Sequence, residues 1–209
     1  MLFRSADSVT RFNAGFRQEN NIDDVNLSFD NEVLINDRLR LEGGISFIGH
    51  EISYKTSLED SLVSDDNEEG NISSFYATAK AELTKKLSAS LGVRINYHEI
   101  NDQYYNEPRF SLNFKATEKL NLKAAVGKYH QFVNQIVYDD PYQGNQNFWV
   151  FSNFDGAPVV ESDHIIAGFT YQLNGFLVDV EGYSPDSGQK LMRKSINFVL
   201  SKLISEANV

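Results

Sequence analysis

Residues 110–127 read FSLNFKATEKLNLKAAVG and predict two β-strands joined by a tight turn. Apolar side chains recur at every second position on both sides of this turn, at Phe110, Leu112, Phe114 and Ala116 and then at Leu120, Leu122, Ala124 and Val126. A period of two places successive side chains on opposite faces of a strand, whereas an amphipathic helix needs spacings of three and four. The polar residues Thr117–Lys119 between the two runs favour a hairpin turn.

The same alternation extends along much of the chain. We expect strands at residues 8–17, 22–36, 37–56, 72–85, 87–100, 107–117, 119–132, 162–173 and 175–183. Several of these exceed the five or six residues usual in globular sheets. A strand that crosses a membrane with tilt needs about 9–11 residues. The sequence therefore predicts an all-β fold, an antiparallel up-and-down meander of about nine strands.

The predicted connections alternate between short and long. Tight polar turns are expected at Asn36-Asp37, Lys85-Lys86, Thr117–Lys119 and Leu173–Gly175, and longer connections at Arg17–Asn21, Ser57–Asn71, Asn101–Glu107 and Val133–Ser162. A meander that crosses a membrane places every second connection on the same side. Outer-membrane barrels keep their periplasmic turns short and their extracellular loops long. A soluble sandwich has no reason to sort its loops in this way, so the pattern favours a transmembrane barrel.

Composition excludes several classes of function. The 209 residues carry a formal net charge of −10 and no cysteine. Without cysteine there is no disulfide framework, thiolate zinc site or iron–sulfur cluster. The negative charge argues against a protein that tracks nucleic-acid phosphates, so we expect no nucleic-acid partner. No run reaches the roughly 18–20 apolar residues of a transmembrane helix, but that test does not detect transmembrane strands.

The two faces of the expected strands differ in polarity, which leaves two explanations open. One face is rich in Leu, Ala, Val and Phe, and the other carries Arg40, Glu42, Lys80 and Arg94. Lipid outside and a wet lumen inside would explain this difference, and so would a soluble sheet with one buried face. The alternatives to part of a large barrel are a self-contained small outer-membrane β-barrel with a structural or adhesive role and a soluble carbohydrate-binding β-sandwich.

Four segments resemble the C-terminal half of the barrel of TonB-dependent outer-membrane receptors. In Glu107–Leu112 a Pro-Arg opens a strand, and in Ala125–Phe132 a strand ends in glycine and aromatic residues. In Glu161–Gly168 an acidic residue precedes a strand that contains a glycine, and in Val180–Tyr183 a hairpin ends in an acidic residue and a tyrosine. The resemblance covers roughly residues 20–183. It implies part of a β-barrel that belongs to a receptor and transporter for uptake of a ligand across the cell outer membrane.

The resemblance also sets expectations for partners and for the ends of the chain. It implies outer-membrane lipid around the barrel, and action of the TonB system only through a plug domain. We expect these 209 residues to lack that plug and to form an incomplete barrel over residues 1–183. Residues 184–209 depart from the family, and the apolar positions in Gln189–Ala207 predict a short C-terminal helix. A gene fragment, a truncation or a frameshifted tail would account for this ending.

No catalytic constellation is found in the sequence. The four histidines lack the spacing of a metalloprotease zinc site, and there is no nucleophile elbow or phosphate-binding loop. The acidic run Ser64–Gly70 lacks the regular spacing of a calcium loop and fits a solvated loop tip better. We therefore expect no enzyme activity, no cofactor and no metal.

The segment Val133–Val160 is the best candidate for ligand binding. A connection of this length is usually functional or disordered. Its aromatic, amide and acidic side chains suit a site that stacks on a ligand and hydrogen-bonds to it, such as a siderophore or an oligosaccharide. The candidates are Tyr138, Tyr142, Asn145, Phe148, Trp149, Phe151 and Asp155. The alternative is that these aromatic residues only pack the loop against its own barrel.

Overall fold

The computed structural model describes residues 2–13, 16–59, 61–140, 144–153, 156–173, 176–187 and 195–202, with the side chains of 17–59, 61–137, 148–153, 156–172 and 176–184. The strands are β1 (Leu2–Asn13), β2 (Phe16–Asn36), β3 (Leu39–Leu58), β4 (Ser61–Glu82), β5 (Leu87–His98), β6 (Gln103–Lys115), β7 (Leu120–Gln131), β8 (Val133–Asp140), β9 (Gly144–Phe151), β10 (Val160–Leu173), β11 (Phe176–Ser187) and β12 (Ser195–Lys202). No helix in the described part of the chain is long and apolar enough to cross a membrane.

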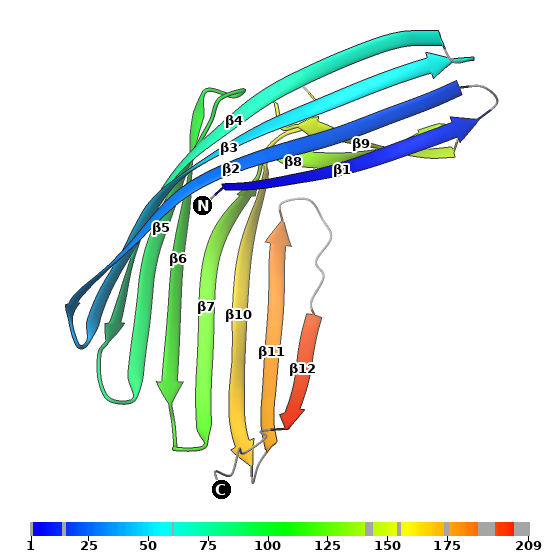
Figure 1. Ribbon diagram of the computed structural model, residues 1–209. Coiled ribbons are helices and arrows are strands. Elements are labelled where there is room, and N and C mark those ends of the chain that lie inside the picture. Colours follow the sequence, from blue (N-terminus) through cyan, green and yellow to red (C-terminus); the bar gives the residue numbers. More distant parts are fainter. Residues whose placement is uncertain are drawn as a thin grey trace, which may run out of the picture.

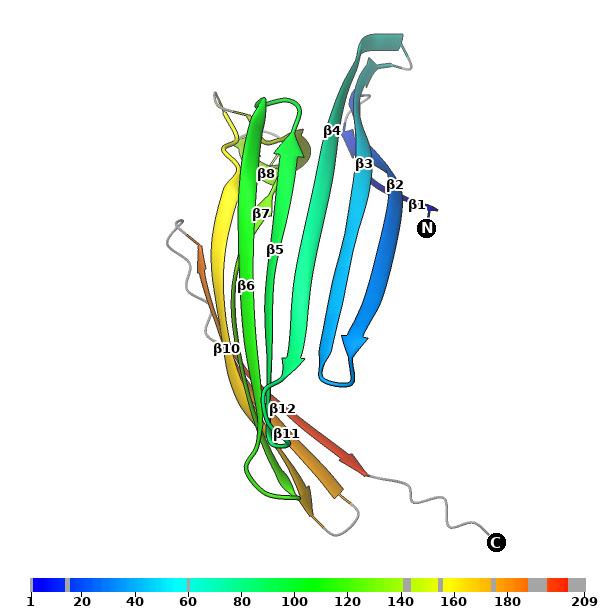
Figure 2. The same cartoon turned by 90° about the vertical axis from the view of Figure 1, so that its left-hand side faces the viewer.

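Within the described residues, ten strands form one antiparallel sheet in the order β1-β2-β3-β4-β5-β6-β7-β10-β11-β12. This sheet is curled like part of a barrel wall (Figures 1 and 2). Strands β8 and β9 form a separate two-stranded hairpin, which lies behind β1 and β2 in the view of Figure 1. The predicted antiparallel meander of a partial barrel is thus confirmed. We call the end of the sheet near β8 and β9 the hairpin end and the opposite end the turn end.

Strand register places side chains of one kind in rows across the sheet. One row crosses seven neighbouring strands and is apolar throughout: Val33, Leu41, Ala79, Leu91, Phe110, Val126 and Ile165. The adjacent row, one residue along each strand, holds Glu32, Glu42, Thr78, Gly92, Arg109, Gly127 and His164. Because successive side chains point to opposite faces, the first row defines an outer face and the second an inner face.

The apolar outer face is exposed. Leu91 is 65% exposed, Phe29 63% and Ile165 57%. The buried hydrophobic residues of the described chain are only Ile22, Ile52, Ile72, Phe132 and Phe151, and all of them belong to the inner side at the hairpin end or to the β7–β9 region. A soluble β-sandwich would instead bury one face of each sheet against the other. The structure therefore has the polarity of a barrel wall, with apolar residues outside.

Hydrogen bonds between strands order the inner face. Arg94 Nη2 donates to Ser46 Oγ at 2.8 Å, and Arg94 Nε donates to Asn96 Oδ1 at 3.1 Å. Ser74 Oγ donates to the same Asn96 oxygen at 2.7 Å, and both Ser74 and Asn96 are buried. Two further pairs on this face are Tyr76 with Asp30 and Lys80 with Glu42. These polar side chains of the inner face thus satisfy one another, whereas Asn26 Oδ1 and Asn121 Oδ1 on the same face are buried without a partner in the described chain.

Three turns at the turn end are closed by the same pattern of hydrogen bonds from backbone to side chain. Asn36 Oδ1 accepts the backbone N–H of Arg38 at 2.9 Å and of Leu39 at 3.0 Å. Thr84 Oγ1 and Thr117 Oγ1 accept the N–H groups two and three residues further on in the same way. A side chain that bonds to its own turn replaces the missing ladder partners and fixes the turn. The predicted short turns at residues 36–37, 85–86 and 117–119 are confirmed.

The longer predicted connections differ from the structure. Arg17–Asn21 lies inside β2, and most of Ser57–Asn71 lies in β3 and β4, which pair almost to the tip of their hairpin. The segment Val133–Ser162 connects β7 to β10, as predicted, but it contains the hairpin of β8 and β9. These segments carry polar residues on both faces, so they lack an apolar alternation although their backbones still pair. The lengths predicted for the first two connections were therefore too long.

The predicted C-terminal helix is wrong for residues 195–202. This stretch forms β12, which pairs with β11 so that Ile196 lies opposite Gly182 and Phe198 opposite Val180. Apolar residues at 196, 199 and 200 fit a helix, but those at 196, 198 and 200 fit a strand, and the free edge of β11 decides in favour of the strand. The rest of the predicted helix lies outside the described residues. The division of the chain at residue 183 stays a prediction.

Candidate functional site

The β8–β9 hairpin folds onto the inner face at the hairpin end of the sheet. The backbone N–H of Trp149 in β9 donates to Asn20 Oδ1 in β2 at 2.6 Å. Phe151, which is 2% exposed, packs with Ile22 of β2 and Ile52 of β3. Ile22 and Ile52 lie directly opposite each other in the ladder, so they present one apolar surface to the hairpin. This contact fixes the hairpin against strands that precede it by about a hundred residues in the sequence.

Close approach between Phe151 and β4 depends on Gly70. A Cβ atom added at Gly70 would lie 3.0 Å from Phe151 Cε1 and 2.7 Å from Ile100 Cδ1. Any side chain at this position would displace the phenyl ring of Phe151, since carbon atoms that are not bonded to each other rarely come so close. The His50 ring meets Phe151 edge-on from another side, with centroids 6.2 Å apart. Gly70 therefore has a packing role, which the acidic sequence around it did not predict.

Aromatic residues and a buried carboxylate anchor the base of the hairpin. Phe132, just before β8, stacks on His98 with ring centroids 5.0 Å apart and meets Tyr105 edge-on at 5.1 Å. Glu107, which is 4% exposed, accepts the backbone N–H of His130 at 2.9 Å. Arg109 Nη2 donates to the other Glu107 oxygen at 2.8 Å. These two hydrogen bonds offset the free-energy cost of burying the Glu107 carboxylate.

The His98 imidazole is enclosed in this cluster. His98 is 1% exposed, and its Nδ1 has no hydrogen-bond partner within the described chain. Burial lowers the pKa of His98, and the nearby His50 lowers it further, because both disfavour the charged imidazolium. His98 lies at the hairpin end of β5, beyond the apolar rows of the outer face. The surroundings of His98 thus favour the neutral imidazole over the charged imidazolium.

A groove of about 410 Å³ opens between the hairpin and strands β2–β4. Register places Asn20, Tyr54 and Asp66 in one inner row, and Ile22, Ile52 and Glu68 in the next. On the hairpin side, Ile136, Phe148, Trp149 and Val150 line the groove. The groove has an apolar and aromatic centre with carboxylates along one side. Such a combination of apolar walls and a few polar groups is usual for small-molecule sites.

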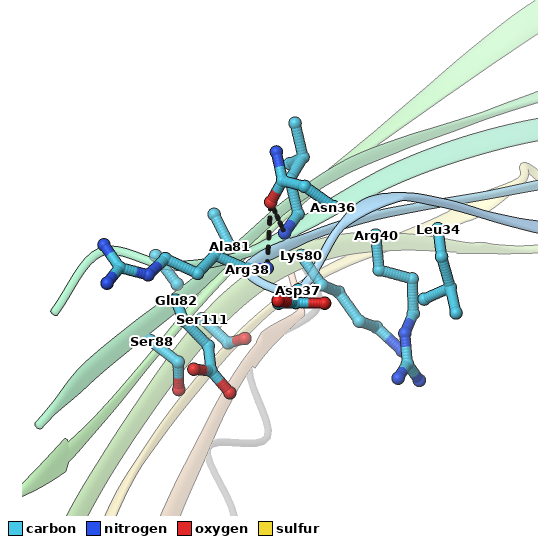
Figure 3. Close-up of a pocket in the computed structure, with 12 residues that line it drawn as sticks. Leu34, Asn36, Asp37, Arg38, Arg40, Lys80, Ala81, Glu82, Ser88 and Ser111 are labelled. Atoms are coloured by element: carbon cyan, nitrogen blue, oxygen red, sulfur yellow. Dashed lines mark hydrogen bonds between the residues drawn. The ribbon is translucent and has the colours of Figure 1, made fainter. Parts of the chain in front are cut away.

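A second cavity, of about 260 Å³, lies at the turn end (Figure 3). Its lining carries charges of both signs, from Asp37, Arg38, Arg40, Lys80 and Glu82. Figure 3 shows the two hydrogen bonds to Asn36 that close the turn beside it. No aromatic side chain lines this cavity. It lacks the stacking surfaces of the groove at the hairpin end, which is the stronger candidate for a ligand site.

The candidates predicted from the sequence fall into four groups. Phe148 and Trp149 line the groove, whereas Phe151 of β9 is buried between the hairpin and the sheet. Tyr138 lies in β8 and Asn145 in β9, at positions where only the backbone is described. Tyr142 and Asp155 lie outside the described residues. Contact of these residues with a ligand stays a prediction.

Sequence reasoning missed the opposite wall of the groove. Asn20, Tyr54, Asp66 and Glu68 come from β2–β4, far from the hairpin in the sequence. Nothing local distinguishes them from other polar residues of these strands. Only the register of the three strands, which brings Asn20, Tyr54 and Asp66 into one row, could have indicated them.

Comparison with solved structures places the curled sheet among known receptor barrels. The siderophore receptor PirA from Pseudomonas aeruginosa matches with a TM-score of 0.61 and 10% identity, over 96% of this chain and 44% of that one. The ferric enterobactin receptor PfeA, in complex with BCV-L6, matches with a TM-score of 0.56 and 17% identity, over 82% and 27%. The RagAB peptide transporter matches with a TM-score of 0.54 and 14% identity, over 92% and 29%.

The fold is that of part of a TonB-dependent receptor barrel. The resemblance found in the sequence is thus confirmed at the level of the fold. The chain spans less than half the length of the receptors it matches. These structural neighbours are receptors and a transporter, not enzymes. No family model and no curated protein matches the sequence.

Proposed function

We propose that this chain forms part of the β-barrel of an outer-membrane receptor that takes up a ligand across the outer membrane. The apolar row that crosses seven strands is the observation that carries the proposal. Its side chains are exposed over the width of the sheet, while the opposite face is polar and internally hydrogen-bonded. In water this arrangement would leave a large apolar patch unprotected. In a bilayer the outer face contacts lipid and the inner face lines the lumen.

The two edges of the sheet bear on the size of the intact barrel. Strands β1 and β12 are the edge strands of the sheet within the described residues. An open edge leaves unpaired backbone groups, which cannot be tolerated in hydrocarbon, so a spanning sheet must close into a barrel. We infer that further strands pair with β1 and β12 in the intact receptor. Coupling to TonB would act through a plug domain in that barrel.

For the ligand, we propose a siderophore, an oligosaccharide or a compound of similar size that enters from the hairpin end. The likeness to siderophore receptors and to a peptide transporter supports uptake of a ligand in general. Phe148 and Trp149 present aromatic surfaces in the groove, and stacking on such surfaces suits sugar rings and aromatic chelates. The enclosed hairpin of β8 and β9 would position these two residues within the lumen.

Lipid contact of the outer face can be tested with a single tryptophan moved between the two faces. Trp149→Phe removes the only tryptophan of the chain. In that background, Leu91→Trp places an indole on the outer face and Ser90→Trp places one on the inner face, since neighbouring strand residues point to opposite sides. Each variant is refolded into micelles of a brominated alkyl-maltoside, whose bromine atoms quench fluorescence by contact.

We expect strong quenching for Leu91→Trp and little for Ser90→Trp. Circular dichroism in the same micelles shows that each variant has β-structure. Equal quenching at the two positions, or a cooperative β-protein that folds without detergent, would overturn the membrane assignment.

A further inference from the structure

We propose that the groove between β2–β4 and the β8–β9 hairpin binds a cationic ligand that has an apolar or aromatic part, and that it disfavours anionic ligands. The inference deepens the proposed function and rests on it, since it names the ligand class of the same receptor. Among the ligands proposed above, those that carry a positive charge fit, as does a basic peptide-like molecule of similar size, whereas an anionic ferric chelate does not.

The walls of the groove determine the apolar part of the ligand. Ile52 forms the sheet side, and Phe148 and Trp149 form the hairpin side. The Tyr54 and Phe148 rings meet edge-on with centroids 5.6 Å apart, which joins the two walls at one end. Tyr54 is held in place because Gln18 Nε2 donates to its hydroxyl oxygen at 2.6 Å. A flat or extended apolar group of a ligand can therefore pack against fixed aromatic surfaces.

The charges of the groove determine the polar part. Asp66 and Glu68 are two residues apart in β4, so their side chains share the inner face, and both line the groove. None of the ten lining residues is a lysine or an arginine. The ion pair between Lys55 and Asp65, on the same two strands, uses residues outside this lining. The groove therefore presents net negative charge beside low-dielectric walls, a setting that concentrates cations and repels anions.

The groove differs in this respect from the cavity at the turn end. That cavity has Arg38, Arg40 and Lys80 beside its two carboxylates, so its cations outnumber its carboxylates by one. An anionic ligand that reached the groove would meet two carboxylates and no compensating cation among the lining residues. A cation would gain Coulomb energy there, and aromatic rings beside it would add attraction through their negative faces. Charge complementarity thus selects a cationic occupant.

Fluorescence of Trp149 tests the proposal directly, because this residue is the only tryptophan and lines the groove. The whole chain is refolded in micelles of an unbrominated alkyl-maltoside at low ionic strength. Caesium and iodide then serve as cationic and anionic quenchers of the same indole. Each quenching constant is divided by the constant of the same ion for free N-acetyltryptophanamide, because iodide is intrinsically the stronger quencher of indole. We expect this normalised constant to be about fivefold larger for caesium than for iodide, which corresponds to a local potential on the order of one kT. Added sodium chloride should reduce this ratio by screening.

A matched pair of ligands extends the test from ions to molecules. Phenylalanyl-arginine amide is cationic, and acetyl-phenylalanyl-glutamate is an anionic peptide of similar size. We expect the first to change Trp149 emission in a saturable way and the second to have no effect at the same concentration. Equal binding of the two peptides, or binding of the anionic one alone, would overturn the assignment of the ligand class.

Neighbouring glutamates provide the control. Glu68→Gln removes one charge from the groove, whereas Glu69→Gln removes the same charge from the next residue of β4, which points to the other face. Glu68→Gln should reduce the caesium-to-iodide ratio at least about twofold, and Glu69→Gln should leave it nearly unchanged. Equal effects of the two substitutions would show that the quenching ratio reports the net charge of the whole protein, and would contradict a local site in the groove.

These outcomes are separate from those that test the membrane assignment. Failure of the outer face to contact detergent would remove the receptor function but leave the quenching of Trp149 readable. Conversely, micelle insertion with equal normalised quenching constants for caesium and iodide would retain the barrel and reject the cationic ligand.

Discussion

The two faces of this sheet use the same backbone but are stabilised in different ways. On the outer face, residues such as Phe75 and Leu91 point away from the protein and are more than half exposed. On the inner face, Asn96 is buried in a hydrogen-bond network and Phe151 covers the small core. Outer residues therefore depend on the surrounding medium, and inner residues depend on one another. Substitutions of matched residues on the two faces can separate these two sources of stability.

The largest effect is expected for Phe151→Ala compared with Phe75→Ala. Phe151 is 2% exposed and packs on Ile22 and Ile52, so its removal leaves a cavity between hairpin and sheet. A loss of about 3–5 kcal/mol in hairpin docking is expected. Trp149 emission should shift to longer wavelength in Phe151→Ala and stay unchanged in Phe75→Ala. The comparison between the faces fails if Phe75→Ala shifts the emission as well.

A charge introduced on each face gives the next largest effect. Leu91→Lys places an ammonium on the outer face, near the middle of the apolar row, and Ser90→Lys places one on the inner face. In lipid, the outer charge should lower the free energy of unfolding by about 2–4 kcal/mol. The inner charge should cost less than about 1 kcal/mol, because the lumen is wet. Urea titration in micelles measures both, and equal costs would contradict a lipid-facing outer side.

A buried amide on the inner face should matter more than an exposed one. Asn96→Ala removes the acceptor for Ser74 and for Arg94 Nε, and leaves a buried hydroxyl unpaired. The expected cost is about 1–3 kcal/mol in the free energy of unfolding. Asn113→Ala, on an exposed position of the same face, should cost less than about 0.5 kcal/mol. Similar losses for both variants would argue that the network does not stabilise this face.

The smallest effect is a dependence on pH at the hairpin end. The pKa of His98 is lowered in the folded chain, so the unfolded chain binds a proton more readily. Its contribution to stability is therefore complete above about pH 6.5 and is lost as the pH falls below that value. In His98→Phe this part of the dependence should disappear, while the stacking on Phe132 is retained. Urea midpoints of both proteins between pH 5 and 8 measure the difference, which isolates His98 from the other histidines.

Strand positions could be predicted where alternation is strong. Residues 107–132 carry apolar side chains on one face only, and the predicted strands agree with β6 and β7 within a few residues. Strands β8 and β9 and the first half of β4 were missed because polar residues occupy both of their faces. The pairing of these segments is set by their partners in the fold rather than by their own pattern.

The candidate site could be predicted only in part. Phe148 and Trp149 were identified because aromatic residues gather in a long polar segment, but their partners in β2–β4 carry no local signal. Tyrosines show the same limit, since Tyr97 lies on the outer face whereas Tyr54 bonds to Gln18 and meets Phe148 on the inner face. The sequence around each tyrosine does not show which face it occupies, whereas the register of the strands does.

The hydrogen bond between Trp149 and Asn20 also bears on the order of folding. It joins residues 129 positions apart, so it can form only when β2 and the hairpin have been brought together by the strands between them. Contacts of such separation form slowly, since the entropy of closing the intervening chain is lost before they are gained. We therefore expect docking of the hairpin to be a late kinetic event. The emission of the single tryptophan should mark the time at which β2–β7 have come together.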